Sequence, residues 1–600
     1  MTQQPQQETE IPSKTRALIF RGKAALLQLR RGWQNSFDRQ INSFSVNHEL
    51  KYQPIIGESK TALWTENNRA EQFLLAGKIQ NLRVAVQKLN GAEIPAGATF
   101  SFWAQIGKTT RRKGYVAGRE LREGCIIPNI GGWLCQLSNA LYDAALQANL
   151  EIIERHAHTQ IIPGSLAEMN RDATVFWNYV DLRFKSENAF RIEANLSANH
   201  LTVRFKARES KIHQITPITA IQNPKSKIQN PNSCMTCGVG DCFRSLKQSE
   251  NLEFGRTTFL VDEFTPEFDL YLQENRQSND LLFVPLDGKR FKKPNYAWTR
   301  AGFAKLKQSW LTTLVRSYKS RRLAAQGAQR QRNLLLMAEK LAVSYAKKLP
   351  FDATHLVVQQ NLLPFLWRDG HLGGRTFDVL MTALPIKTLQ EQLDYAASLH
   401  PESPTLGDFR AENQLLENET EALKNARKII TSHTEIAALF VDKSILLDWK
   451  MPPPKVFEKK QSEKFTIVFP ASTVGRKGVY ELREALSALP EEIKLIILGA
   501  ELEGSGFWRG FDVEHGSNDW LQRADLVVLP AFVEHKPRRL LLAAASGVSV
   551  IASKACGLEN VHGITSIKSG DVEWLRREIE KARFKRKPFA AHGHEIVKTQ

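Results

Sequence analysis

Cysteine is scarce in this sequence, and long apolar runs are missing. Six cysteines among 600 residues are too few for a disulfide-built fold and favour a reducing compartment. No apolar run reaches the roughly 18 to 20 residues that a membrane-spanning helix needs. The first residues, Met1 to Pro5, have neither a charged region nor an apolar one, so we expect no signal peptide. These absences predict a cytoplasmic protein.

Acidic residues are outnumbered: 63 Asp and Glu stand against 82 Lys and Arg, a formal net charge of +19. Such an excess favours an anionic partner. Between Lys289 and Lys348, sixteen Lys or Arg accompany a single acid, with Trp and Leu among them. This stretch is either a solvated helical face or a contact with an anionic membrane surface, which would make the protein peripheral at the inner face of the membrane. No nucleic-acid motif accompanies the charge, so no specific nucleic-acid partner is expected.

Short apolar runs alternate with helical spacing near the carboxyl end of the chain. Near-continuous Val, Ile and Leu runs are typical of a parallel sheet that helices cover on both faces. Such a sheet binds ligands at the carboxyl ends of its strands. The expected strands are Phe465–Pro470, Lys494–Gly499, Leu526–Pro530, Val548–Ser553 and Gly563–Lys568, with helices at Tyr480–Leu489 and Arg538–Ser546.

Two polar motifs follow strands of this expected sheet. Gly475-Arg476-Lys477-Gly478 comes after the first strand, and Glu534-His535-Lys536-Pro537 comes after the third. An Arg-Lys pair before a helix suits a diphosphate, because it adds two cations to the amide groups of the helix N-terminus. We expect no metal here, since no Asp-x-Asp pair suited to holding Mg²⁺ is present.

The stretches FPASTVGRKGVYELREAL, LIILGA and ADLVVLPAFVEHKPRRLLLAAASGVSVIAS resemble the donor-binding half of retaining, two-lobed (GT-B) glycosyltransferases of the family 4 type. The resemblance implies a nucleotide-diphosphate sugar as donor, with Gly475, Arg476 and Lys477 at its diphosphate. It implies that Glu534 contacts the donor sugar or ribose. The family's second Glu, which holds the ribose, is replaced here by Leu542.

Two functions follow from this resemblance. The first is transfer of a sugar to a cell-envelope or other glycan acceptor, or to a lipid-linked one. The second is that of a non-catalytic, membrane-peripheral scaffold with a decayed transferase, because the replaced Glu puts ribose recognition in question.

A separate mixed domain is expected over residues 51–207. The pair Gly131-Gly132 opens a helix and places Cys135 in its first turn, where the helix dipole favours a thiolate. A following strand would carry His156 and His158 on the same side, and Asp172 begins the next run. Nucleophile, base and orienting acid in this order are typical of thiol acyl-transfer enzymes. A Cys on a helix is also often a small buried hydrophobic residue.

This domain closely resembles the VanW family, which is associated with vancomycin-resistance clusters. The resemblance covers about 150 residues and implies no settled chemistry. We expect a transglutaminase-like or cysteine-peptidase-like site of Cys135, His158 and Asp172, with His156 as the competing base. The alternative function is therefore a Cys-dependent acyl transferase or amidase acting on peptide or peptidoglycan-like amides. The motifs that carry the resemblance are IPAGATFSFWAQIG, KGYVAGRE, GGWLCQLSNALYDAAL, IIERHAHT and DATVFWNYVDLRFK.

The segments around this domain are polar. Residues 1–50 comprise an expected disordered tail and a basic amphipathic segment, Lys14–Trp33, which packs on its own protein or lies on an anionic membrane. Residues 208–255 read as a linker with a Pro-containing heptapeptide repeat. The linker holds three closely spaced thiols, which favour a Zn²⁺ or iron–sulfur site over a redox pair or unliganded thiols. These thiols are Cys234, Cys237 and Cys242.

Residues 256–445 are expected to form an amino-terminal acceptor lobe, and residues 446–600 the donor-nucleotide lobe. The runs TTFLVDEF, LLFVPL, ATHLVVQQ, FDVLMTAL and RKIITSH predict strands separated by helices. The predicted fold class is thus α/β and multidomain, a mixed α+β VanW-like domain followed by two Rossmann-like lobes (GT-B). The candidates near the acceptor cleft are His371, Gly373, Gly374 and Arg375.

Overall fold

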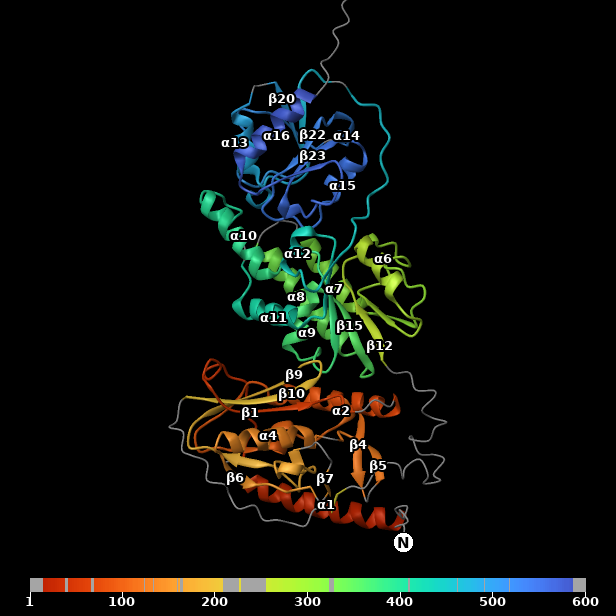
Figure 1. Ribbon diagram of the computed structural model, residues 1–600, viewed down its shortest axis with the longest axis vertical. Helices are drawn as coiled ribbons and strands as arrows, with labels where there is room; N and C mark the ends of the chain where they lie inside the picture. Colours follow the sequence, from red (N-terminus) through yellow and green to blue (C-terminus); the bar gives the residue numbers. More distant parts are fainter. Residues whose placement is uncertain are drawn as a thin grey trace, which may run out of the picture. The chain divides into compact units, whose positions relative to one another are not determined.

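The computed structural model describes residues 14–37, 41–65, 69–122, 125–132, 134–158, 160–161, 166–208, 226–227, 255–322, 328–407, 410–460, 462–489, 492–516 and 518–585. They form two compact units (Figure 1). The first unit runs to Thr258 and also includes Lys348–Leu356 and Leu366–Thr376, and the second contains the rest. Among the described helices, none is long and apolar enough to cross a lipid bilayer.

The core of the first unit is a four-stranded antiparallel sheet in the order β1-β10-β9-β2. Along β10, buried and partly exposed side chains alternate, as expected for a strand with one face on the core. Helix α2 packs on β9, and helix α4 packs on β1 and β10. These elements are β1 (Ile55–Ala62), α2 (Arg69–Leu89), β2 (Ala92–Ile94), α4 (Cys135–Gln147), β9 (Phe190–Leu196) and β10 (His200–Ala207).

The first unit also contains a three-stranded sheet in the order β3-β8-β6, the hairpin β4-β5 and a short parallel pair, β11-β7. Phe184 on β8 packs against Phe205 on β10 with ring centroids 5.5 Å apart, which joins the small sheet to the core. The elements are α1 (Lys14–Phe37), β3 (Thr99–Ser101), α3 (Phe102–Ile106), β4 (Ala117–Arg122), β5 (Cys125–Ile130), β6 (Glu151–Glu154), β7 (Gln160–Ile161), β8 (Arg183–Lys185) and β11 (Ser226–Lys227).

The runs expected to carry the histidines and Asp172 as strands are only partly strands. β6 ends at Glu154, and residues 155–158 and 171–175 have irregular backbone. Side chains bond to backbone groups that would otherwise pair with a neighbouring strand. The Asp172 carboxylate accepts a hydrogen bond from the His158 amide, and the Arg155 side chain donates to the Asp172 carbonyl. The prediction that His156 and His158 share one side of a strand is therefore wrong.

Helix α1 packs on the first unit through polar side chains. Arg31 pairs with Glu154, and Arg183 donates to Asn35 at 2.7 Å. Packing on its own protein, one of the two expectations for this segment, is confirmed for these residues. Apolar side chains of the same helix are exposed, among them Leu26, Leu29 and Trp33.

The second unit contains a seven-stranded sheet in the order β14-β13-β12-β15-β16-β17-β18. Counted along the chain this order is 3-2-1-4-5-6-7, and the β13-β14, β16-β17 and β17-β18 pairs are parallel. The strands are β12 (Arg256–Leu260), β13 (Leu281–Val284), β14 (Lys305–Gln308), β15 (Ala353–Gln359), β16 (Thr376–Leu380), β17 (Lys428–Thr431) and β18 (Ser444–Leu446). The helices are α6 (Pro266–Asn275), α7 (Trp310–Arg322), α8 (Ala328–Ala346), α9 (Leu363–Arg368), α10 (Ile386–Leu399), α11 (Asn413–Asn425) and α12 (Thr434–Leu439).

A six-stranded parallel sheet follows in the order β21-β20-β19-β22-β23-β24, which is 3-2-1-4-5-6 along the chain. This is the Rossmann order. Helices α13 and α16 contact each other on one face, and α15 lies on the other (Figure 1). The expected α/β class with two Rossmann-like lobes is confirmed by the two sheet orders. The elements are β19 (Phe465–Phe469), α13 (Val479–Ser487), β20 (Ile493–Ile497), β21 (Asp512–His515), α14 (Trp520–Arg523), β22 (Leu526–Leu529), α15 (Arg538–Ala545), β23 (Ser549–Ser553), β24 (Ile564–Ile567) and α16 (Val572–Lys585).

Candidate functional site

The strand order of the six-stranded sheet reverses between β19 and β22. Open α/β sheets bind ligands at such a switch point, outside the carboxyl ends of the strands. The loop after β19 contains Gly475–Lys477, and the loop after β22 contains Glu534. The backbone joins the two loops, because the Arg476 carbonyl accepts the amides of Phe532 at 3.0 Å and Val533 at 3.2 Å. The sheet topology thus brings together the two motifs that the sequence analysis selected.

Gly478 allows the two loops to touch. Its φ of +75° is in the left-handed region, and a Cβ there would lie 2.1 Å from the carbonyl oxygen of Pro530. Helix α13 begins at the next residue. Only glycine satisfies both the backbone conformation and the close approach.

Lys477 and Glu534 lie together at the switch point. Lys477 Nζ is 2.9 Å from Glu534 Oε2 and also donates to the Val533 carbonyl at 2.8 Å. Glu534 Oε1 accepts the Lys536 amide at 2.7 Å. Burial acts to raise the pKa of Glu534, but Lys477 and the Lys536 amide outweigh it and hold that pKa below its ordinary value. The site therefore pairs a cation with an ionised carboxylate, both 16% exposed or less.

Buried His433 and partly buried His535 flank Glu534. His535 lies within the motif after the third expected strand, but neither histidine was assigned a role from the sequence. His433 follows β17, and its Nε2 lies 3.3 Å from the Glu534 carbonyl oxygen. Burial lowers the pKa of His433, and burial with the charge of Lys477 lowers that of His535 to about 3. Among the described residues, His433 Nδ1 and His535 Nε2 have no hydrogen-bond partner. The position of His433 after the expected strand RKIITSH was the available signal, since ligands gather where parallel strands end.

Gly475 has a packing role in this structure. Its amide N–H donates to Thr405 Oγ1 at 3.0 Å and to the Glu503 carboxylate, so this N–H is already hydrogen-bonded and does not face a diphosphate. A Cβ at this position would lie 2.6 Å from Leu406. The connection between α10 and α11 therefore packs on the loop after β19. The expectation that Gly475 binds the donor is not supported by its contacts.

Leu542 is the position where the resembled family has its second Glu. It is partly buried and packs against the hydrophobic core of the donor lobe. An isobutyl side chain has no polar atom for a ribose hydroxyl. Leu542 in place of the family's second Glu therefore replaces a polar side chain by an apolar one that packs on the core.

The second candidate site is in the first unit and centres on Asp172, whose side chain is fully buried. Its Oδ1 accepts Arg155 Nη2 at 2.9 Å. Its Oδ2 accepts the His158 amide at 2.7 Å and lies 2.8 Å from His158 Nδ1. With both carboxylate oxygens paired, Asp172 fixes the plane of the His158 ring.

His158 is hydrogen-bonded to Asp172 and lies close enough to Cys135 for that side chain to act on its pKa. Burial lowers the pKa of His158, but Asp172 and Cys135 outweigh this and raise it to about 9. Cys135 is the first residue of α4 and is partly exposed. The structure thus assembles Cys135, His158 and Asp172, three residues that the sequence analysis proposed together.

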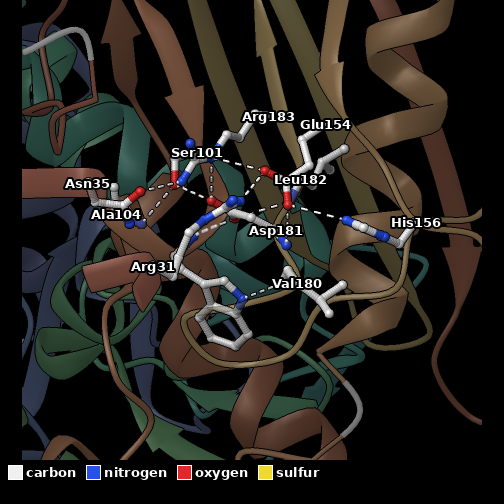
Figure 2. A network of polar contacts seen from close by, with 11 residues as sticks. Arg31, Asn35, Ser101, Ala104, Glu154, His156, Val180, Asp181, Leu182 and Arg183 are labelled. Atoms are coloured by element: carbon white, nitrogen blue, oxygen red, sulfur yellow. Dashed lines mark hydrogen bonds and ion pairs between the residues drawn. The ribbon is translucent and has the colours of Figure 1, made fainter. Parts of the chain in front are cut away.

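His156, the competing base, faces elsewhere. Figure 2 shows its ring directed at Glu154, with Nε2 3.3 Å from Oε1. Glu154 also accepts a hydrogen bond from Arg31 and lies 3.5 Å from Arg183 (Figure 2). The geometry therefore selects His158 over His156.

The candidates for the acceptor cleft belong to the first unit and hold a turn in place. Arg375 is buried and donates to the carbonyls of Ala353 and His371, each at 2.7 Å. Arg83, on α2, donates to the carbonyl of Gly373 at 2.9 Å. These contacts give the segment a structural role. The four candidates are His371, Gly373, Gly374 and Arg375.

The expected metal site lies outside the described residues, since its ligands are Cys234, Cys237 and Cys242. Within the part of the chain that the structure describes, no group of three or more His, Cys, Asp or Glu side chains is placed to hold a metal ion. The switch point instead offers Arg476 and Lys477 as its cations.

Comparison with known families places a match in the first unit. Residues 77–206 match the model of the family described as "VanW like protein". "Uncharacterized protein YoaR" of Bacillus subtilis is 33% identical over 107 residues, 18% of this chain and 35% of that protein. "Vancomycin B-type resistance protein VanW" of Enterococcus faecalis is 30% identical over 136 residues, 22% of this chain and 50% of that protein. The chain thus spans half or less of the length of the curated relatives it matches.

Solved structures similar to this chain cover 55% of it and 90% of their own chains. They include sucrose-phosphate synthase from Thermosynechococcus elongatus, with a TM-score of 0.37. Anabaena Alr3699/HepE in complex with UDP has a TM-score of 0.33, and the lipopolysaccharide outer core galactosyltransferase WaaB has 0.32. Each is 13% identical to this chain.

Proposed function

We propose that this chain transfers a sugar from a nucleotide-diphosphate donor to a glycan acceptor, and that the donor binds at the switch point of the six-stranded sheet. One observation carries the proposal: Lys477 and Glu534 meet at the carboxyl ends of two adjacent parallel strands, β19 and β22. This is where a Rossmann sheet receives a nucleotide. The resemblance of the surrounding residues to family 4 glycosyltransferases supports the same assignment.

The two cations of the loop after β19 would act on the leaving group. Departure of the sugar leaves negative charge on the diphosphate, and fixed cations in a partly buried site stabilise that charge as it develops. Lys477 is held in place by the Val533 carbonyl and by Glu534. Arg476 is partly exposed and close enough to His535 to lower the pKa of that ring, so its charge is near the same point.

Glu534 and the neighbouring histidines would orient the donor sugar. An ionised carboxylate accepts hydrogen bonds from sugar hydroxyls, and the neutral rings of His433 and His535 each keep a buried nitrogen that can bond to a hydroxyl. Because these two nitrogens have no partner among the described residues, filling them with ligand hydroxyls would remove a desolvation cost. Retention of anomeric configuration is part of the proposal through the family resemblance.

The test is thermal stabilisation of the full chain by UDP, GDP, ADP and related diphosphates. A ligand at 100 times its Kd stabilises the native state by about 2.7 kcal/mol, which raises Tm by several degrees for a lobe of this size. We expect one diphosphate to raise Tm and the Arg476→Ala/Lys477→Ala variant to lose the shift. Lys494→Ala is the matched control, since Lys494 pairs with Glu514 at 2.9 Å on neighbouring strands of the same lobe.

Two results would count against the proposal. One is the absence of a Tm shift with every diphosphate, and the other is a shift that the double variant keeps. The first result would favour the second candidate function, a scaffold with a decayed transferase, which the apolar packing of Leu542 supports.

A further inference from the structure

We propose that Cys135, His158 and Asp172 form a second catalytic centre, which transfers acyl groups from peptide-type amides through a thioester on Cys135. This activity is independent of the sugar transfer proposed above. It uses residues of the first unit alone.

The base is oriented by a carboxylate that has no freedom to turn. Asp172 is fully buried, and Arg155 holds it from the other side through Oδ1 at 2.9 Å and through the Asp172 carbonyl at 2.7 Å. Arg155 in turn lies over the Tyr142 ring, 5.1 Å from its centroid. His158 can therefore meet Asp172 only at Oδ2, by its amide and by Nδ1. A proton held on Nδ1 by a carboxylate leaves Nε2 as the catalytic nitrogen.

The nucleophile is placed by the same helix that binds the segment of Asp172. Residues at i, i+3 and i+4 lie on one face of a helix. Ser138 and Asn139 therefore lie on the same face of α4 as Cys135. Ser138 donates its hydroxyl hydrogen to the Ala173 carbonyl at 2.6 Å, and Asn139 Oδ1 accepts a hydrogen bond from the Ala173 amide at 2.8 Å. One turn of α4 therefore carries the nucleophile and clamps the residue that follows the orienting acid. This clamp ties α4 to the segment of Asp172, and Asp172 in turn holds His158.

The base carries a proton at neutral pH, since Asp172 and Cys135 raise the pKa of His158 to about 9 against the effect of burial, and Asp172 is bonded to its Nδ1. An imidazolium beside sulfur is the acid that an amide needs, because the departing nitrogen must be protonated as it leaves. His158 is thus suited to donate to a leaving amine.

The N-terminus of α4 is placed to stabilise the oxyanion that forms when Cys135 attacks a carbonyl group. Amide groups of a helix N-terminus point outwards and carry the positive end of the dipole. In α4, a helix of 13 residues, no side chain of the described residues caps this end, and its first turn contains no acidic residue. Negative charge that develops on a carbonyl oxygen bonded to Cys135 Sγ would lie against these amides.

The reaction balances with water as the second substrate. Sγ, as a thiolate whose proton is held by His158 Nε2, bonds to the amide carbon, and the carbonyl electron pair moves to oxygen. The pair then returns, and the C–N bond breaks as His158 gives this proton to the nitrogen. A thioester and a free amine result. Water then attacks the thioester and passes a proton to His158, the C–S bond breaks, and a carboxylic acid leaves. An amine in place of water gives transfer to a new amide.

The experiment uses the full chain with 4-nitrophenyl acetate as the acyl donor and intact-protein and peptide mass measurement as the readout. We expect one acetyl group on Cys135, with release of 4-nitrophenolate. The decisive comparison is between two histidines two residues apart. His158→Gln should slow acetylation of Cys135 at least tenfold, whereas His156→Gln should stay within about twofold of the unmodified chain. Peptide mapping separates Cys135 from Cys556, which is buried.

Three results would overturn the proposal: no acetyl group on Cys135, equal slowing by both histidine variants, or no slowing by His158→Gln. Circular dichroism like that of the unmodified chain, with a Tm well above the assay temperature in both variants, shows that unfolding is not the cause of a difference. A second arm tests the amide class with a panel of peptide 4-nitroanilides, which the full chain should cleave and Cys135→Ala should not. Acetylation without cleavage of any anilide would refute amides as the substrate class.

Discussion

The two candidate sites differ in what holds them together. The main chain holds the switch point together, because Gly478 lets the loops touch and the Arg476 carbonyl accepts hydrogen bonds from two amides of the loop after β22. Side chains hold together the thiol site, which consists of Cys135, His158 and Asp172. Arg155, Asp172 and Asn139 bond there to one another or to irregular backbone. A site held by its topology should survive the loss of one side chain. A site held by buried polar side chains should not, since each deletion leaves a buried group unpaired.

The largest effect is expected from Arg155→Met. Asp172 is fully buried, and removing one partner of a buried ion pair costs about 3–5 kcal/mol. The matched control is Arg171→Met, since Arg171 pairs with Asp143 but is 43% exposed, and a pair of this kind contributes about 1 kcal/mol or less. Urea unfolding followed by tryptophan fluorescence measures both. Equal losses would mean that the thiol site does not depend on the buried pair.

Gly478→Ala should give the next largest effect and tests the backbone side of the comparison. Its added Cβ meets the Pro530 carbonyl at 2.1 Å, whereas Gly547, with φ of +77°, has open space around an added Cβ. Both alanines adopt the left-handed conformation at a cost of about 1 kcal/mol. Only Gly478→Ala also forces the two loops apart, for about 1–3 kcal/mol more. Thermal unfolding with and without nucleotide should show a larger loss for Gly478→Ala, together with loss of the ligand shift.

The same comparison predicts opposite pH effects for two histidines. In the native state the pKa of His158 is raised to about 9, so its stabilisation is complete below its unfolded pKa of roughly 6.5 and is lost as pH rises towards 9. The pKa of His535 is lowered to about 3 by burial and Lys477, so its contribution is complete above roughly 6.5 and is lost as pH falls towards 3.

Stability measured from pH 3 to 9 in the unmodified chain, His158→Gln and His535→Gln isolates each contribution. The groups that face His158 are Asp172, Arg155 and Cys135. His158→Gln should flatten the alkaline limb only, and His535→Gln the acidic limb only. A change on the opposite limb in either variant would contradict the assignment of that histidine.

The donor lobe could be predicted closely from the sequence because its strands are buried on both faces. The five expected strands and the helices at Tyr480 and Arg538 are present within about two residues of their expected ends. In the seven-stranded and six-stranded sheets, the strands that the sequence did not reveal are β14, β18 and β21, which lie at sheet edges. Two of them are polar, the KLKQ of β14 and the DVEH of β21, so no apolar run marks them, whereas the edge strand β24 was expected.

The thiol site could be predicted in its residues but not in its backbone. The spacing of Cys135, His158 and Asp172 is visible in the chain, but the apolar alternation around them suggested strands. What decides the conformation is a set of bonds from side chains to distant backbone, such as Asn139 to the Ala173 amide, and no local pattern encodes such bonds. For the same reason the choice between His156 and His158 needed the structure.

The smallest effect, and the sharpest test of the switch point, concerns Leu542→Glu. If the site has lost only its ribose contact, a carboxylate at this partly buried position should strengthen binding of a nucleoside diphosphate by no more than about tenfold, or about 1.4 kcal/mol. Part of the gain is offset because Leu542 leaves the apolar core. Leu542→Gln controls for shape, and inorganic pyrophosphate controls for the diphosphate, whose affinity should not change because it has no ribose. Tighter binding of nucleotide but not pyrophosphate would mean that backbone topology has preserved the donor site while one side chain changed. Equal changes for both ligands would mean that position 542 acts through the fold of the loop, and the contrast with the thiol site would then disappear.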